Sequence, residues 1–548
     1  MDTIEGLFAR LEQLNEIGSA LSQESNLDAL LEKILLAAQK ITHADGGTLY
    51  LLEGGSRLNF AIMRNDSLSI AMGGTTGNPI PFYPVQLYGK DNEPNNRMVA
   101  AYAALSGKTV NIADAYEAEG FDFSGTRNFD KKTGYQSRSF LTVPMRNHAG
   151  EIIGVLQLIN CKPNSDGGFV PFSESDQRLA ESLASQAAIA ITNRQLIIQL
   201  EELFESFIGL INSAIDEKSP YTGGHCQRVP VLTMLLAEAA NATESGPFSE
   251  FRMTDKDRYE LKIAGLLHDC GKVTTPVHIV DKATKLETIY DRIHLIDTRF
   301  EVIKRDVEIA ALKAQSEVLR KGMLDEVQLR SAIYSIEQSL RDEYRRIDED
   351  REFIRRHNIG GEFMIPEAQD RILEIAAKYR WIDPSGNLAQ LLTENEVENL
   401  TITKGTLTAA ERETINHHIV ATINMLEVLP WPKHLSKVPE YAGGHHERMD
   451  GKGYPRGLKR EEMSVPSRMM GIADIFEALT AKDRPYKRGK TLSESLQILG
   501  KFKQDGHIDA DLFDVFVRKK VYLEYAVQFL DAQQIDHVDE GKIPGYSA

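Results

Sequence analysis

The 548-residue sequence has little cysteine, no excess of positive charge and no long apolar run. Its three cysteines, Cys161, Cys226 and Cys270, are too few and too scattered for a disulfide framework or a paired-cysteine zinc site, and they favour a reducing compartment. A formal net charge of −17 argues against a surface that grips nucleic-acid polymers. No apolar run approaches the roughly 18 residues of a membrane span, and the acidic start lacks signal-peptide features. We therefore expect a cytoplasmic protein that binds neither nucleic-acid polymers nor membranes.

The chain is too long for one hydrophobic core, so we expect several domains. Residues 4–42 carry apolar positions at helical spacing, with a break near Ser25 and Asn26. Residues 47–52, 140–144 and 152–160 have strand character, and 147–150 form a turn between the last two strands. This pattern predicts an α+β domain over residues 1–172.

Residues 173–218 repeat apolar positions at three- and four-residue steps, which predicts one long helix. Such a helix is too long to be buried along one small domain, so we expect parallel pairing with a second copy in a homodimer. The alternative is an ordinary connecting helix packed on its own domains. Residues 219–548 have the pattern of an all-α domain, interrupted by a charged helical insertion at about 287–403 whose role the sequence leaves open.

Histidine and aspartate cluster at several places in this second half. These residue types hold first-row divalent metals, so the clusters predict a hydrolytic metal centre assembled from distant helices. A single His-Asp pair or a double histidine is weak evidence alone, but the joint pattern is specific. Lys272 lies close after His268 and would place an ammonium beside a substrate phosphate. The clustered residues are His225, His268, Asp269, His417, His418, His445, His446 and Asp474.

Residues 219–286 and 404–500 together resemble the HD-GYP subfamily of the HD phosphohydrolase superfamily. The resemblance rests on His268-Asp269, on His445-His446 followed by Gly453-Tyr454-Pro455, and on residues 472–480 with Arg484-Pro485-Tyr486. It implies a helical domain that hydrolyses cyclic di-GMP at a site of two or three divalent metal ions, usually iron or manganese.

Position by position, the resemblance implies seven metal ligands: His225, His268, Asp269, His418, His445, His446 and Asp474. His418 is preferred over His417 because it lies seven residues after Glu411, as in the family pattern. Lys272 and Asp269 would be catalytic. Substrate contacts would come from Lys272, Arg484, Lys487, Gly453, Tyr454 and Pro455.

The chain departs from the family pattern in two positions near the site. Tyr221 stands where members with a third metal tend to have glutamate, so we expect two ions. Thr422 stands in place of a family glycine, which would change a helix contact without removing a ligand.

Residues 20–195 resemble a GAF domain, with the nearest likeness to those of cyclic-nucleotide phosphodiesterases. Asn160, Phe172 and Asp176 fit part of their signature, whereas Cys161 and Gln177 replace its lysine and glutamate. The resemblance implies a small ligand, such as a cyclic nucleotide. A purely structural, dimerising domain is the alternative.

Together these features predict a multidomain protein, an α+β GAF sensor domain joined by a long helix to an all-α HD-GYP domain. We expect a cyclic di-GMP phosphodiesterase that produces linear pGpG and, by a second cut, GMP. Two alternatives stay open. One is a phosphodiesterase for another cyclic dinucleotide such as cyclic GMP-AMP, and the other is a catalytically weak receptor.

Overall fold

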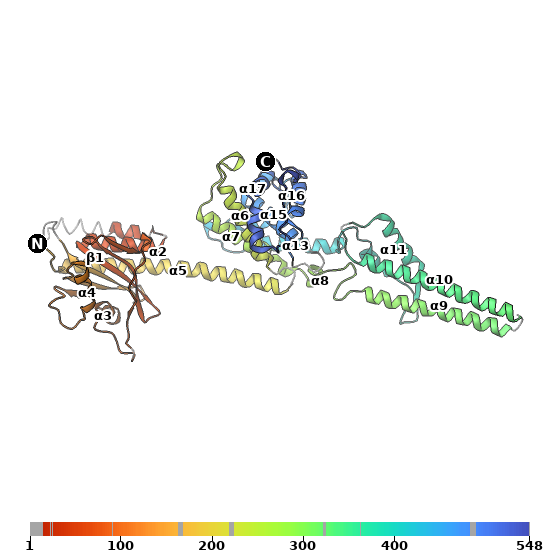
Figure 1. Cartoon of the computed structure of the whole chain (residues 1–548), viewed down its shortest axis with the longest axis horizontal. Coiled ribbons are helices and arrows are strands. Elements are labelled where there is room, and N and C mark those ends of the chain that lie inside the picture. The colour runs from red at the N-terminus through yellow and green to blue at the C-terminus, as the bar shows by residue number, and fades with distance from the viewer. Residues whose placement is uncertain are drawn as a thin grey trace. The chain divides into compact units, whose positions relative to one another are not determined.

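The computed structural model describes residues 15–21, 23–24, 26–89, 91–162, 168–218, 224–321, 325–361, 363–482 and 489–546. The chain forms two compact units, Met1–Phe204 and Glu205–Ala548. Figure 1 labels their helices and strands. Within these described ranges, no helix is both long and apolar enough to cross a membrane.

The first unit is built on an antiparallel sheet with strand order β3-β2-β1-β7-β6-β5, and β4 pairs with β2. The strands predicted around residues 47–52, 140–144 and 152–160 are confirmed as β1, β6 and β7. The elements are α2 (Leu27–Thr42), β1 (Ala44–Glu53), β2 (Arg57–Asn65), β3 (Ile70–Gly73), β4 (Val85–Gln86), α3 (Val99–Ser106), β5 (Val110–Ile112), α4 (Ser124–Thr133), β6 (Phe140–Arg146), β7 (Ile152–Cys161) and α5 (Glu174–Lys218).

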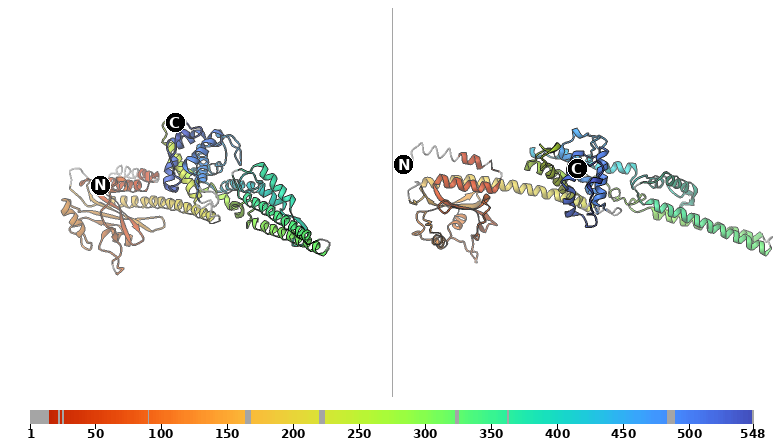
Figure 2. Two further views of the ribbon diagram at one scale, coloured as in Figure 1. Left: turned by 45° about the vertical axis from the view of Figure 1, so that its right-hand side comes forward. Right: turned by 45° about the horizontal axis from the view of Figure 1, so that its top comes forward.

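Helices α2 and α5 bury their apolar stripes in one core with the sheet (Figures 1 and 2). Ile34 of α2 and Ile191 of α5 are fully buried there with Leu156 of β7. The helix break expected near Asn26 is an N-cap, in which the Asn26 side chain accepts a hydrogen bond from the Ala29 amide at 2.9 Å. Helix α5 covers 45 residues, which confirms the long helix.

The second unit is mainly helical. Helix α6 packs on α7, α15, α17 and α18, and its neighbours bury aromatic side chains such as Phe476 and Phe513. The helices of this part are α6 (His225–Asn241), α7 (Asp255–Leu267), α8 (Val277–Val280), α13 (Ala409–Glu427), α14 (Val438–Gly443), α15 (Val465–Thr480), α16 (Leu492–Gln504), α17 (Ala510–Arg518) and α18 (Val521–Phe529).

The stretch between α8 and α13 has a hydrophobic core of its own, which includes Phe300, Ile354 and Ile372. Two long helices lie side by side along it (Figure 2). It also contains a two-stranded sheet that the sequence pattern did not predict. Its elements are α9 (Ile293–Lys321), α10 (Glu326–Asn358), α11 (Pro366–Lys378), β8 (Arg380–Ile382), β9 (Leu388–Gln390) and α12 (Glu394–Leu400).

The two ends of this stretch meet at Lys282. The Thr406 hydroxyl donates to the Lys282 carbonyl at 2.9 Å. The buried Lys282 ammonium donates to Asn399 Oδ1 at 2.6 Å and to Glu411 Oε1 at 2.8 Å. Because Asn399 belongs to α12 and Glu411 to α13, one ammonium joins the end of the insertion to the helix that carries His418.

Candidate metal centre

The predicted ligands gather into two groups in the second unit. His225, His268 and Asp269 form one group, and His418, His445 and His446 form the other. Within each group, one ligand atom from each residue lies within 4.8 Å of the others. All of these side chains are buried except His446, which is half-buried. His417, the alternative to His418, is exposed.

The Asp269 carboxylate lies between the two groups. Its Oδ2 atom is 3.1 Å from His225 Nε2 and 3.2 Å from His268 Nε2, whereas its Oδ1 atom is 3.3 Å from His418 Nε2. Asp474, on α15, extends the first group through an Oδ1 atom 3.3 Å from His225 Nε2. One carboxylate oxygen of Asp269 therefore faces each histidine group, which is the placement of a bridging ligand.

Three histidines are oriented by backbone carbonyls that precede them in the chain. In each one, Nδ1 donates to the carbonyl oxygen three residues earlier, which leaves Nε2 without a proton in the neutral ring. These carbonyls turn three unprotonated nitrogens toward one region. The pairs are His268 with Gly265 at 2.7 Å, His418 with Ile415 at 2.5 Å and His445 with Ala442 at 2.6 Å.

The site has buried acceptor atoms without a donor among the described residues. Asp269 Oδ1 and His445 Nε2 are both buried, and neither accepts a hydrogen bond from this part of the chain. Leaving such an atom without a partner costs about 1–3 kcal/mol. Imidazole nitrogens and carboxylate oxygens facing one another without protons are a donor set that divalent first-row metals satisfy, so these residues fit a pair of such ions.

The electrostatics keep Asp269, His445 and His446 in metal-binding protonation states. Burial acts to raise the pKa of Asp269, but the Lys272 ammonium outweighs it, and the pKa lies well below its usual range. Burial and the neighbouring histidines lower the pKa of His445. Burial likewise lowers the pKa of His446 to about 4, although Asp474 opposes this shift. Near neutral pH, Asp269 is therefore a carboxylate and both histidines are neutral.

Lys272 lies in a 3-10 turn, Cys270–Thr274, that begins after α7 ends. Its Nζ atom is 2.5 Å from Asp269 Oδ2. Burial acts to lower the Lys272 pKa, but Asp269 outweighs burial and raises it, so the side chain is an ammonium. The Lys272 ammonium, which we expected beside a substrate phosphate, therefore lies next to the Asp269 carboxylate that faces both histidine groups.

Thr422 takes part in the contact between this turn and α13. Its Oγ1 atom accepts a hydrogen bond from the Gly271 amide at 2.9 Å. A Cβ atom on Gly271 would lie 2.0 Å from the His418 carbonyl oxygen, so only glycine fits. The threonine that replaces the family glycine thus binds the turn that carries Lys272.

Glu477 and Arg228 belong to the site but were missed in the sequence. Glu477 Oε2 is 2.5 Å from His225 Nδ1, and its Oε1 atom accepts from Arg228 Nε at 2.7 Å. A carboxylate on the outer nitrogen of a ligand histidine fixes the ring orientation and raises its basicity. The available signal was spacing, because Glu477 lies three residues after Asp474 and therefore shares its face of α15.

The Gly-Tyr-Pro segment borders the second histidine group. The Tyr454 ring stacks on His446, with centroids 4.8 Å apart. Gly453 has no room for a side chain, since a Cβ atom would lie 2.3 Å from the Arg448 amide nitrogen. A cavity of about 520 Å³ opens beside this segment and includes His445, His446 and Asp474 in its lining.

Three residues named in the sequence analysis lie outside the described residues. They are Arg484 and Lys487, the predicted substrate contacts, and Tyr221, on which the expectation of two ions rests.

The partial GAF signature is engaged in internal contacts of the first unit. The buried Asn160 side chain accepts from the Arg138 amide at 2.7 Å and donates to the Gln136 carbonyl at 2.7 Å. Asp176 accepts from the Ser173 hydroxyl at 2.7 Å, at the start of α5. The side chains of Asn160 and Asp176 therefore stabilise the first unit itself, which favours a structural role for these two signature residues.

Comparisons with known proteins agree with this architecture. Two models described as HD domain match residues 222–376 and 389–512, and one described as GAF domain matches residues 26–191. The chain therefore contains a GAF domain followed by a helical HD region, which confirms the predicted multidomain fold class.

Three curated relatives are phosphodiesterases. A 3'3'-cGAMP-specific phosphodiesterase of Vibrio cholerae is 48% identical over 83 residues, which cover 15% of this chain and 19% of the relative. A cyclic di-GMP phosphodiesterase of Pseudomonas aeruginosa is 42% identical over 74 residues, 14% of this chain and 17% of the relative. A dual 3',5'-cyclic-AMP and -GMP phosphodiesterase of Takifugu rubripes is 30% identical over 207 residues, which cover 37% of this chain and 21% of the relative. Each match spans about a fifth of the relative's length.

Proposed function

We propose that this GAF- and HD-domain protein is a metal-dependent phosphodiesterase of the HD-GYP type that hydrolyses cyclic di-GMP. The observation that carries the proposal is Asp269, which faces a histidine group with each carboxylate oxygen and contacts the Lys272 ammonium. Substrates of the bacterial relatives named above supply the substrate class. The product is linear pGpG, and a second cut gives GMP.

Two divalent ions, iron or manganese, are the proposed cofactors. His225, His268, Asp269 and Asp474 would hold one, and Asp269 with the group His418, His445 and His446 would hold the other. When bound, the ions supply Lewis-acid polarisation of the phosphate and activation of water.

The protein's own groups then position and stabilise the reacting phosphate. Lys272 keeps its proton at Nζ, so its positive charge is available to the phosphoryl oxygens as negative charge develops on them. Tyr454, stacked on His446, forms part of the cavity wall beside the second histidine group. Glu477 and Arg228 hold His225 in one orientation and so reduce the reorganisation that the reaction requires.

Replacing Asp269 with asparagine tests the site. The variant keeps the side-chain shape but removes the bridging charge, so we expect it to fold and to lose turnover of cyclic di-GMP with added Mn²⁺. Asp531→Asn, at an exposed carboxylate of the same unit, is the matched control and should keep full activity. A folded Asp269→Asn protein with near-normal kcat would refute the assignment.

Cyclic GMP-AMP is the alternative substrate, supported by the Vibrio cholerae relative. The ratio of kcat/KM on cyclic di-GMP to kcat/KM on cyclic GMP-AMP decides between the two. A chain that binds either compound without turnover, while loaded with metal, would instead be a receptor.

For the GAF domain we propose a regulatory small ligand, and adding cyclic AMP or cyclic GMP to the assay tests it.

We also propose that α5 pairs in parallel with α5 of a second copy. Five of its apolar side chains are about half-exposed or more and alternate by four and three residues, which is the period of a coiled-coil seam. The exposed fractions are 51% for Leu196, 66% for Leu200, 54% for Leu203, 55% for Phe207 and 64% for Leu210. The positions flanking this seam carry no charge, so identical copies meet without repulsion: Ile197, Gln199, Phe204, Ser206, Ile211 and Ser213.

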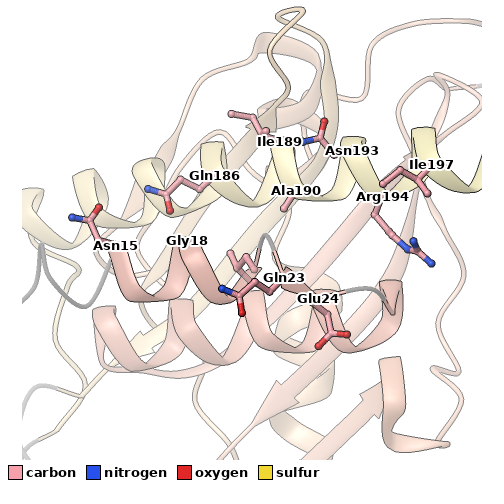
Figure 3. A pocket seen from close by; sticks show the side chains of 11 residues that line it. Asn15, Gly18, Gln23, Glu24, Gln186, Ile189, Ala190, Asn193, Arg194 and Ile197 are labelled. Atoms are coloured by element: carbon pink, nitrogen blue, oxygen red, sulfur yellow. The ribbon is translucent and has the colours of Figure 1, made fainter. Parts of the chain in front are cut away.

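Asn193 occupies the next seam position toward the N-terminus. Figure 3 shows it on α5 beside the helical residues 15–21, where Gly18 and Gln186 also line a cleft of about 560 Å³. A single polar seam residue favours the register that pairs it with its equivalent, which here is the parallel one. Leu200→Asp should halve the mass measured by light scattering, whereas Gly209→Asp, outside the seam, should not. A monomeric wild-type chain would refute the pairing.

A further inference from the structure

The cavity beside the metal centre contains a lysine with no role so far. One part of its lining comes from proposed ligands, including His446 and Asp474, and an apolar part comes from Ala478 and Leu479 of α15. Lys490 also lines this cavity and is half-buried. It follows the last residue of α15 by ten positions and precedes α16.

The other cations that line the cavity already have a carboxylate. Arg448 makes two parallel hydrogen bonds to Asp450, at 3.0 and 2.8 Å. Lys452 is 3.7 Å from the same carboxylate, and its side chain is 79% exposed. Among the residues with described positions, no carboxylate lies within ion-pair distance of Lys490. The cavity thus has one cation whose charge is not already matched by the described part of the chain.

The backbone of Lys490 is fixed against the helix that carries Asp474. The Lys490 amide donates to the Leu479 carbonyl at 3.0 Å. Gln534 Nε2 donates to the Lys490 carbonyl at 3.1 Å and to the Thr480 carbonyl at 2.8 Å. The backbone of Lys490 is therefore held at the end of α15, the helix that carries Asp474, as a binding residue requires.

A cyclic dinucleotide has two phosphodiesters, and only one can react at the metal centre at a time. The second keeps its negative charge when it enters a cavity with an apolar wall, in a protein of net charge −17. An anion in such a place needs a cationic partner or it loses its hydration without compensation. We propose that Lys490 forms a subsite for the non-reacting phosphate of the cyclic dinucleotide. This proposal rests on the proposed function.

The variant Lys490→Met tests the subsite with two substrates. We expect kcat/KM on cyclic di-GMP to fall about 10- to 100-fold, mainly through KM, because a charge-assisted hydrogen bond is lost. Bis(4-nitrophenyl) phosphate has one phosphodiester, so its kcat/KM should not change. Lys490→Arg should restore most of the activity on cyclic di-GMP. Lys501→Met, at an exposed lysine of α16, is the matched control.

Three results would overturn the subsite: equal losses on both substrates, no loss on cyclic di-GMP, or no recovery with arginine. Calorimetric binding of cyclic di-GMP separates this failure from that of the proposed function. A wild-type chain that binds without turnover would refute the phosphodiesterase, while a tenfold weaker affinity of Lys490→Met would still support the subsite. A chain that neither binds nor hydrolyses the compound refutes both.

Discussion

Replacing Glu477 with glutamine should perturb the proposed metal centre without removing a proposed ligand. The carboxylate contacts His225 Nδ1 at 2.5 Å and the Arg228 guanidinium through Nε and Nη2, both at 2.7 Å, and its side chain is 1% exposed. Glutamine has the same shape but offers only one acceptor oxygen. The substitution removes the negative charge and turns an amide donor toward either the ring or the guanidinium.

The magnitude follows from the role of the carboxylate. Loss of such an outer contact to a ligand histidine lowers metal affinity about 10- to 100-fold, or about 1.4–2.7 kcal/mol. We expect the Mn²⁺ concentration for half-maximal activity to rise by that factor. Because Glu477 lies outside the proposed ligand set, kcat at saturating Mn²⁺ should stay within about threefold of the wild type.

The assay is cyclic di-GMP turnover over a Mn²⁺ titration, with thermal melting to verify the fold. Glu260→Gln is the control, since Glu260 is buried in the same unit and accepts from the Lys437 amide at 2.7 Å, away from the histidines. It should leave the Mn²⁺ requirement unchanged. An unchanged Mn²⁺ requirement in Glu477→Gln, or an equal rise in both variants, would show that Glu477 does not orient His225.

Two further substitutions test the surroundings. Burial lowers the pKa of Lys285 to about 8, below the value of about 10.4 expected in the unfolded chain, so the unfolded chain binds more protons between these values. Stability should therefore rise by up to about 3 kcal/mol from pH 8 to 10.4, and Lys285→Met should abolish this rise in urea unfolding; an identical pH profile in the variant would contradict it. Gly271→Ala should destabilise the second unit by about 1–3 kcal/mol and reduce kcat, because its Cβ meets the His418 carbonyl oxygen. Gly209→Ala, with open space around it, should not destabilise, and equal melting temperatures for both alanine variants would refute the contact.

Local patterns predicted much of the fold because they follow from periodicity. In β6 and β7, which pair around the turn at 147–150, apolar residues either alternate with polar ones or form a continuous run. In α5, buried apolar residues recur every three or four positions. Strands β8 and β9 are only three residues each, too short for any period to be recognised. They were therefore not predicted.

The candidate site, like the fold, was predicted only in part from the sequence. The residue types and their order along the chain were visible, so Asp269 and the histidines that lie together in the structure could be proposed as ligands from the sequence. The contact of Glu477 with His225 joins α15 to α6 across 252 positions, and the lining position of Lys490 depends on how α15 and α16 pack. Such distances arise only from tertiary packing, and no single-sequence spacing rule contains them.

The meeting of both insertion ends at Lys282 has a consequence for a chain that lacks the insertion. Since Lys282 and Thr406 are in hydrogen-bond contact, a chain without the intervening segment could close the same gap with a short turn. The segment also brings a hydrophobic core of its own. Deleting the segment would therefore leave a gap that a short turn can span, and Lys282 would lose its hydrogen bond to Asn399 while keeping the one to Glu411.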